Sequence, residues 1–406
     1  MPDKPFDIDR NSADSAKKLI FSTLSAWEIE GAAGISARAL AAAAGLPVSS
    51  IYYHFGDLEQ LSESTQGAAR ALATRWCEAQ LSAMGRDVRG PAALGPLLAA
   101  LIDDWCETRR TLAFARRECE LMALRDPKHV ASCAQWDTLW FDFWQEVCAR
   151  LNIAEMATGT AWVFAGTSSL HLLRWRRPID RAALEELCSG WASWLDGRLA
   201  APSPWYELAR RDAAALMPLP TPDDAMADTI SAAAAATVAK RGVAALTHRA
   251  VATEAGVTLG VVSYKFRTSA ELLRAAFEAI YRRISPQASG DPVAKWVPSR
   301  EEALEQLRHV LAREDMLASE ELMIASARNP TFVAFASQLR YLRGRSARFF
   351  LQALLGRDRL IAPIDGAIFS AFQTGRYRAY LCSGRSSAAD APCNELSALL
   401  ARLHRA

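Results

Sequence analysis

Two stretches of the chain place hydroxyl, phenol and basic side chains on successive turns of a short predicted helix. The first runs Val48, Ser49, Ser50, Ile51, Tyr52, Tyr53, His54, and the second runs Leu259, Gly260, Val261, Val262, Ser263, Tyr264, Lys265. Such side chains form hydrogen bonds with phosphate oxygens and with the edges of bases. Their spacing therefore predicts a surface that recognises nucleic acid.

The elements that would position these side chains are short helices joined by glycine turns. Ser36 is expected to cap a helix that ends near Ala44, Gly45 to form the turn, and Asp57 to cap a long helix after the second short helix, Val48–Phe55. In the second stretch Thr247, Gly256 and Thr268 take the equivalent places. This pattern predicts a helix-turn-helix, whose second helix can lie in the major groove of DNA. A plain helical hairpin inside a bundle is the alternative.

An internal repeat relates the two stretches. Phe55 falls on Phe266 at an offset of 266 − 55 = 211 residues. The same offset pairs Leu19 with Ile230, Trp27 with Val238, Gly31 with Gly242, Leu40 with Val251, Gly45 with Gly256, Ile51 with Val262, and Leu61 with Leu272. A weaker echo pairs Glu120-Leu121-Met122 with Glu321-Leu322-Met323. The chain therefore reads as two copies of one unit.

Composition and the positions of proline clusters divide the 406 residues into helical domains. Hydrophobic residues make up 51% and charged residues 23%, the net charge is +2, and apolar residues recur at helical spacing without alternating strand patterns. Proline clusters near Pro202 and Pro218 bracket a predicted short helix from Trp205 to Leu216. We predict an all-α fold with domains at 1–62, 63–200, 223–273 and 274–406, and a linker at 201–222. Without a signal-like or membrane-spanning apolar run, a cytoplasmic location is expected.

Both helix-turn-helix segments resemble the DNA-binding domain of the TetR family of transcriptional regulators. The resemblance rests on Ser36-Ala37-Arg38, Ala44-Gly45 and Tyr52-Tyr53-His54-Phe55, and on Thr247-His248-Arg249, Ala255-Gly256 and Tyr264-Lys265-Phe266. The family's usual lysine after the second short helix is replaced by Leu58 and Ser269, its tyrosine is Ser263 in the second copy, and neither segment is basic. The resemblance implies two TetR-like units, each a three-helix DNA-binding domain followed by a ligand-binding and dimerisation bundle.

Carried over position by position, the resemblance implies two sets of DNA contacts. The first set is Ser36, Arg38, Val48, Ser49, Ser50, Tyr52, Tyr53 and His54, and the second is Thr247, Arg249, Leu259, Gly260, Val261, Ser263, Tyr264 and Lys265. The expected partner is double-stranded operator DNA, bound by a repressor. A derived helical adaptor that has lost DNA binding is the alternative.

Aromatic residues concentrate in the first regulatory segment, where Trp136, Trp140 and Trp144 recur every four residues. A stripe at this spacing indicates either core packing or a pocket between helices. For the pocket, which the resemblance implies, we expect a small apolar or aromatic effector bound by Trp105, Phe114, Trp136, Trp140, Trp144, Trp162 and His171.

Motifs of enzymes and metal sites are missing from the sequence. It contains no HExxH, GxSxG, Walker loop or GxGxxG, and its six histidines lack metal-binding spacing. We therefore expect no catalytic residue, no metal and no cofactor.

Two units in one chain suggest how the protein assembles. Members of the family normally pair as homodimers through their last two helices. We expect the corresponding helices, near 156–199 and 363–404, to pair within one chain as a pseudo-dimer, because the linker lets the second unit fold back on the first. Two unlike recognition helices would then face successive major grooves. The operator would therefore consist of two unlike half-sites. A homodimer of chains is the alternative.

Overall fold

The structure is a computed structural model in which the regular elements are all helices. It describes residues 15–85, 87–216, 224–284, 298–308, 313–329, 332–356, 358–382 and 394–404. Within these segments no strand occurs, which confirms the predicted all-α class. None of the described helices has both the length and the apolarity needed to cross a membrane.

The two halves of the chain contain helices in a corresponding order. The first half contains α1 (Ser15–Ile29), η1 (Ala32–Gly34), α2 (Ala37–Ala44), α3 (Ser49–Phe55), α4 (Leu58–Ala83), α5 (Pro91–Glu107), α6 (Arg110–Arg125), α7 (Val130–Arg150), α8 (Ala157–His171) and α9 (Arg177–Leu195). After α10 (Pro204–Ala215), the second half contains α11 (Ala225–Arg241), η4 (Val243–Ala245), α12 (His248–Ala255), α13 (Leu259–Lys265), α14 (Ser269–Ile284), α15 (Arg300–Arg308), α16 (Arg313–Arg328), α17 (Val333–Tyr341), α18 (Arg345–Leu355), α19 (Pro363–Cys382) and α20 (Asn394–His404).

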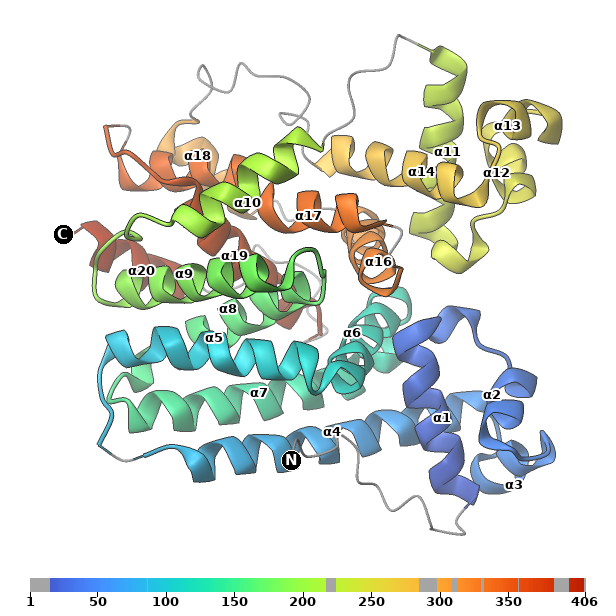
Figure 1. Cartoon of the computed structure of the whole chain (residues 1–406), viewed down its shortest axis with the longest axis horizontal. Coiled ribbons are helices and arrows are strands. Elements are labelled where there is room, and N and C mark those ends of the chain that lie inside the picture. Colours follow the sequence, from blue (N-terminus) through green and yellow to red (C-terminus); the bar gives the residue numbers. More distant parts are fainter. Residues whose placement is uncertain are drawn as a thin grey trace.

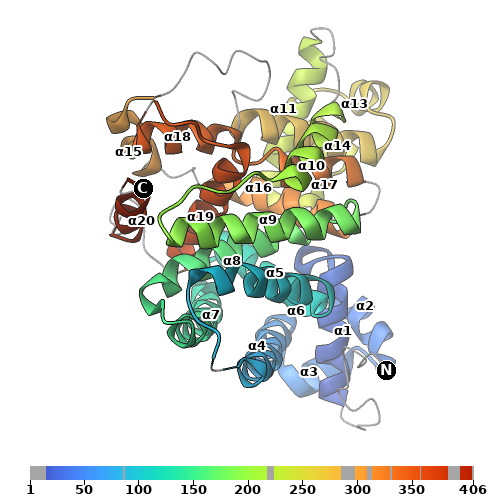
Figure 2. The ribbon, with the colours of Figure 1, turned by 60° about the vertical axis from the view of Figure 1, so that its left-hand side comes forward.

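Two three-helix heads lie on the same side of the molecule. We call α1–α3 with the start of α4 the first head, and α11–α13 with the start of α14 the second head. Both views show the heads on the right-hand side, one above the other (Figures 1 and 2). Helix α6 contacts α1, α16 contacts α11, and α6 and α16 contact each other, so these two helices connect the heads.

The two halves share a hydrophobic core. It contains Trp105 and Trp194 of the first half together with Phe369 and Leu399 of the second. Helix α8 packs along α19, and α9 contacts both α19 and α20. The helices that the sequence predicted to meet are therefore in contact.

Glycines allow α8 and α19 to approach closely. A Cβ atom added to Gly166 would overlap the carbonyl oxygen of Ala371, and one added to Gly375 would overlap the carbonyl oxygen of Trp162. Because a backbone carbonyl cannot move without its helix, only glycine fits at these two crossing points.

The segment between the repeats also joins this core. The predicted helix from Trp205 to Leu216 is confirmed as α10, which packs against α9 and α17. Tyr206 is buried, and its hydroxyl donates to the carbonyl oxygen of Tyr341 at 3.3 Å. Part of the expected linker is thus held between the two halves.

Candidate nucleic-acid interface

The first short helix of each head is capped by the same local hydrogen bonds. Ser36 Oγ accepts from the Ala39 N–H at 3.2 Å, and Thr247 Oγ1 accepts from the Ala250 N–H at 3.1 Å, so each caps the first short helix of its head. Each of these helices ends at a glycine in the left-handed conformation, Gly45 with φ 67° and Gly256 with φ 66°. The turns that aim α3 and α13 are therefore equivalent.

Buried aliphatic side chains fix the inner faces of α3 and α13. Ile51 and Val262 are both fully buried. The other residues paired by the repeat are buried in the same way: Leu19 with Ile230, Leu40 with Val251, and Leu61 with Leu272. Since one face of each short helix is held in the head, the opposite face is left to solvent.

That opposite face carries the predicted contact residues. Tyr53 is 84% exposed and its repeat partner Tyr264 is 78% exposed. In the first head Ser36, Arg38, Ser49, Tyr52 and His54 are exposed, whereas Val48 and Ser50 are half-buried. In the second head Thr247, Arg249, Leu259, Gly260 and Ser263 are exposed, whereas Val261 and Lys265 are half-buried. Among these predicted contacts, each head thus presents at least one phenol, two hydroxyl side chains and one arginine to solvent.

Lys265 differs from the other predicted contacts because it already has an acidic partner. Its Nζ lies 2.6 Å from Asp224 Oδ2, and Asp224 also caps α11 by accepting from the Ala227 N–H at 3.0 Å. This ion pair ties the end of α13 to the start of α11. No local pattern could have revealed it, because the two residues are 41 positions apart.

The first head is held by an arginine from the second half. Arg328 at the end of α16 lies against Gly31 and donates to the carbonyl oxygen of Trp27 from Nη2 at 2.6 Å. It also forms an ion pair with Glu118 of α6, whose other carboxylate oxygen accepts from the Ala32 N–H at 2.9 Å. The turn after α1 is therefore fixed by residues of both halves.

The second head is held in the reciprocal way. Arg125 at the end of α6 lies against Gly242 and forms an ion pair with Glu321 of α16. Glu321 Oε2 in turn accepts from the Val243 N–H at 3.5 Å. We call these two arrangements the reciprocal lock: Arg125 and Glu321 at the second head, and Arg328 and Glu118 at the first. Arg125 and Arg328 each follow one of the two Glu-Leu-Met segments of the sequence echo, but spacing alone does not indicate that they cross between the halves.

A buried charge cluster continues from the lock along α6. Glu320 of α16 accepts hydrogen bonds from Arg378 of α19 at 2.7–3.0 Å and forms an ion pair with Arg117 of α6. Arg117 and Arg116 both pair with Glu120 on the same helix. These charges connect α6, α16 and α19 across the boundary between the halves.

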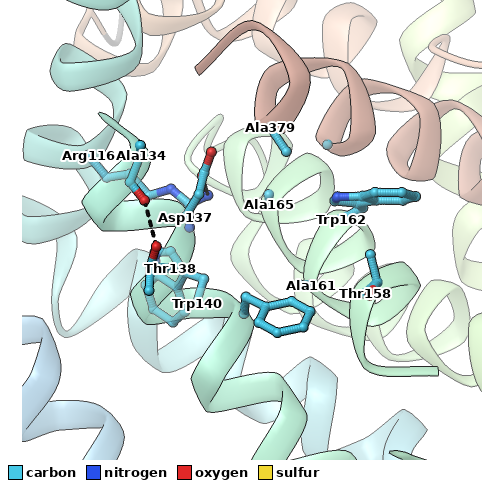
Figure 3. Close-up of a pocket in the computed structure, with 12 residues that line it drawn as sticks. Arg116, Ala134, Asp137, Thr138, Trp140, Thr158, Ala161, Trp162, Ala165 and Ala379 are labelled. Carbon is cyan, nitrogen blue, oxygen red and sulfur yellow. Dashed lines mark hydrogen bonds and ion pairs between the residues drawn. The ribbon is translucent and has the colours of Figure 1, made fainter. Parts of the chain in front are cut away.

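A pocket with a volume of about 350 Å³ lies beside this cluster. It is lined by Arg116, Ala134, Asp137, Thr138, Trp140, Phe141, Thr158, Ala161, Trp162, Ala165, Gly375 and Ala379. Figure 3 shows Arg116 and Asp137 at one end, Trp162 at the other, and Ala379 projecting from α19. The pocket is therefore formed by both halves.

Two of the predicted effector contacts, Trp140 and Trp162, line this pocket. Trp105, Phe114, Trp136 and Trp144 are fully buried in the shared core. There Trp105 packs edge-on against Trp140 with ring centroids 4.8 Å apart. The four-residue spacing of the stripe therefore reflects core packing at most of its positions.

His171 lies in a polar bridge between the halves. Its Nε2 lies 2.9 Å from Asp103 Oδ1, and its Nδ1 lies 2.6 Å from Arg340 Nη2 of α17. Because a guanidinium only donates, Nδ1 must accept and Nε2–H must donate to Asp103. Burial and the charge of Arg340 lower the pKa of His171 to about 4. The neutral ring joins α8 to α17 and does not line the pocket.

Comparison with known proteins adds no relative. No protein-family model matches the chain, and a search of curated proteins found no match. The class of protein is therefore defined by the structure alone: an all-helical chain with two equivalent heads joined through a common core.

Proposed function

We propose that this protein is a transcriptional regulator of the TetR type whose two unlike heads bind the two halves of one operator. The observation that carries the proposal is the pair of exposed tyrosines, Tyr53 and Tyr264, at equivalent places on the solvent faces of two short helices that follow equivalent glycine turns. Tyrosine combines a large apolar surface with a hydrogen-bonding hydroxyl, and its exposure at two equivalent positions supports a contact outside the chain.

The contact between the halves supports an intramolecular pseudo-dimer. The close crossing of α8 and α19 and the reciprocal lock join the two heads within a single chain. With both heads in one molecule, binding of one head makes the contact of the second intramolecular, which raises the overall affinity. This effect compensates for heads that carry few free cations, since Lys265 is paired with Asp224.

The position of the pocket supports regulation by a small ligand. Arg116 lines the pocket and lies on α6, the same helix that carries Glu118 and Arg125 of the reciprocal lock. A ligand that favours one placement of α6 would change the placement of both heads. It can do so only if it binds the two placements with different affinity.

Replacing the exposed tyrosines tests the proposed DNA contact. We expect Tyr53→Ala and Tyr264→Ala each to weaken binding to the selected operator by about 1–3 kcal/mol if the phenol reads a base. The operator is first selected from random duplex DNA with the unaltered chain, and affinities are then measured by fluorescence anisotropy at fixed salt.

The matched control is Trp205→Ala, which removes an exposed aromatic side chain from α10, away from both heads. It should leave the affinity for operator unchanged. If no duplex is selected, or if neither tyrosine substitution changes the affinity of a folded protein, the chain is not a DNA-binding regulator and the helical adaptor function is favoured.

A further inference from the structure

The pocket between α6, α7, α8 and α19 carries a charge that a ligand can reach. Of its twelve lining residues, Arg116 and Asp137 are the charged ones. The side chain of Asp137 is 27% exposed, whereas that of Arg116 is 9% exposed. The accessible charge in the pocket is therefore negative.

Arg116 is already engaged by groups of the protein. Its Nε donates to Glu120 Oε1 at 3.2 Å, and its guanidinium lies over the ring of Trp140 with the Cζ atom 5.2 Å from the ring centroid. It approaches Asp137 only at 3.5 Å, which is long for a charge-assisted hydrogen bond. A ligand anion would meet the more exposed Asp137 carboxylate, while the Arg116 guanidinium is already paired, so the pocket disfavours anions.

Asp137, in contrast, lacks full compensation of its charge. Burial raises the pKa of its carboxyl, and Arg116 only partly opposes this shift. A positive group placed next to Asp137 would stabilise the carboxylate, while Arg116 would keep Glu120 as its partner. Arg116 thus keeps a carboxylate partner when Asp137 pairs with a ligand, although it shares Glu120 with Arg117.

The rest of the wall is apolar and aromatic. Phe141 is 43% exposed, Trp162 is half-buried, and Ala134, Ala161, Ala165 and Ala379 complete the surface. Aromatic faces attract cations as well as apolar groups. The pocket thus offers a carboxylate at one end and aromatic surface along the rest (Figure 3).

We propose that this pocket binds an amphipathic organic cation, with an ammonium group at Asp137 and an aromatic or aliphatic body along Phe141 and Trp162. The role of such a cation as effector rests on the proposed function, whereas its binding does not. Both halves of the chain line the site, so binding of a ligand there depends on how the two halves pack. Ala165, which lines it, also accepts a hydrogen bond from Arg378 of the charge cluster at 3.2 Å.

Three probes of nearly equal size test which sign of ligand charge the pocket prefers. Isothermal titration calorimetry of the full chain at neutral pH compares naphthylmethylamine, naphthylmethanol and naphthoate. We expect the amine to bind about tenfold or more tightly than either of the others, because only the protonated amine carries a positive charge and forms an ion pair with a carboxylate. Equal binding of the three probes, preference for naphthoate, or no binding of the amine would overturn the inference.

Variants on one helix locate the site. Asp137→Asn keeps the size of the side chain and removes its charge, and should abolish the preference for the amine. The control is Asp142→Asn, an exposed carboxylate on the same helix that does not line the pocket, and it should keep that preference. If Asp137→Asn keeps the preference, the amine binds elsewhere and the inference fails.

Parallel measurement of operator affinity separates this inference from the proposed function. A chain that binds operator but shows no amine preference contradicts the pocket assignment and leaves the regulator function intact. A chain that binds the amine through Asp137 but selects no DNA supports the pocket assignment and contradicts the regulator function. If operator is bound and the amine lowers its affinity in the unaltered chain but not in Asp137→Asn, both are supported.

Discussion

Replacing Gly375 by alanine is expected to force α8 and α19 apart and to lower the free energy of unfolding by about 1–3 kcal/mol, with a larger loss when Gly166 is replaced as well. A Cβ atom at either position would overlap a backbone carbonyl of the other helix, at Trp162 or Ala371. No side-chain rotation relieves such an overlap. Chemical denaturation followed by circular dichroism measures the loss.

The matched control for this substitution is Gly67→Ala in α4. A Cβ atom added there would have its nearest neighbour, Arg70 Nη2, at 3.9 Å. Alanine in an unobstructed helical position is expected to raise the free energy of unfolding by about 0.5–1 kcal/mol relative to glycine. Opposite signs at Gly375 and Gly67 would show that α8 and α19 cross closely in solution, whereas a neutral effect at both Gly375 and Gly166 would show that they do not.

Replacing Glu320 by alanine is expected to lower the free energy of unfolding by about 3–5 kcal/mol, because it leaves buried arginines without their carboxylate. Glu320 is the shared partner of Arg117 in α6 and Arg378 in α19. Replacement of the exposed Glu301 in α15 serves as the control and should have little effect.

The same variant should alter the dependence of stability on pH. Burial opposes the charge of Glu320, but Arg117 and Arg378 outweigh it and lower its pKa from 4.5 to about 2. A lowered pKa means that the stabilisation is complete above pH 4.5 and is lost as the pH falls towards 2. Between these values the unaltered chain should lose stability more steeply than Glu320→Ala. Parallel curves for the two proteins would contradict the assigned ion pairs.

Local features of the fold could be predicted from sequence because each depends on neighbouring residues. Ser36 and Gly45 specify a cap and a left-handed turn through bonds within a few positions, and both predictions are confirmed. The α10 helix could also be predicted from local sequence, because prolines bracket it. The aliphatic residues that the repeat pairs are buried in both copies, because the same apolar positions recur.

Features that depend on docking could not be predicted in this way. The ion pairs of Arg125 with Glu321 and of Arg328 with Glu118 join residues that are about two hundred positions apart. Their formation requires the crossing of α6 and α16, which no local pattern specifies. For the same reason the tryptophan stripe could not show that Trp140 lines the pocket whereas Trp136, which is buried in the same core, does not.

The most direct test of the account is the composition and symmetry of the complex with operator. Native mass spectrometry of the DNA-free and DNA-bound protein counts the chains, and hydroxyl-radical footprinting of the selected operator maps the contacts. We expect one chain on each operator, with two protected half-sites of unlike sequence about one helical turn apart. Substitution at Tyr53 should affect one half-site and substitution at Tyr264 the other. A palindromic footprint occupied by two chains would contradict the account.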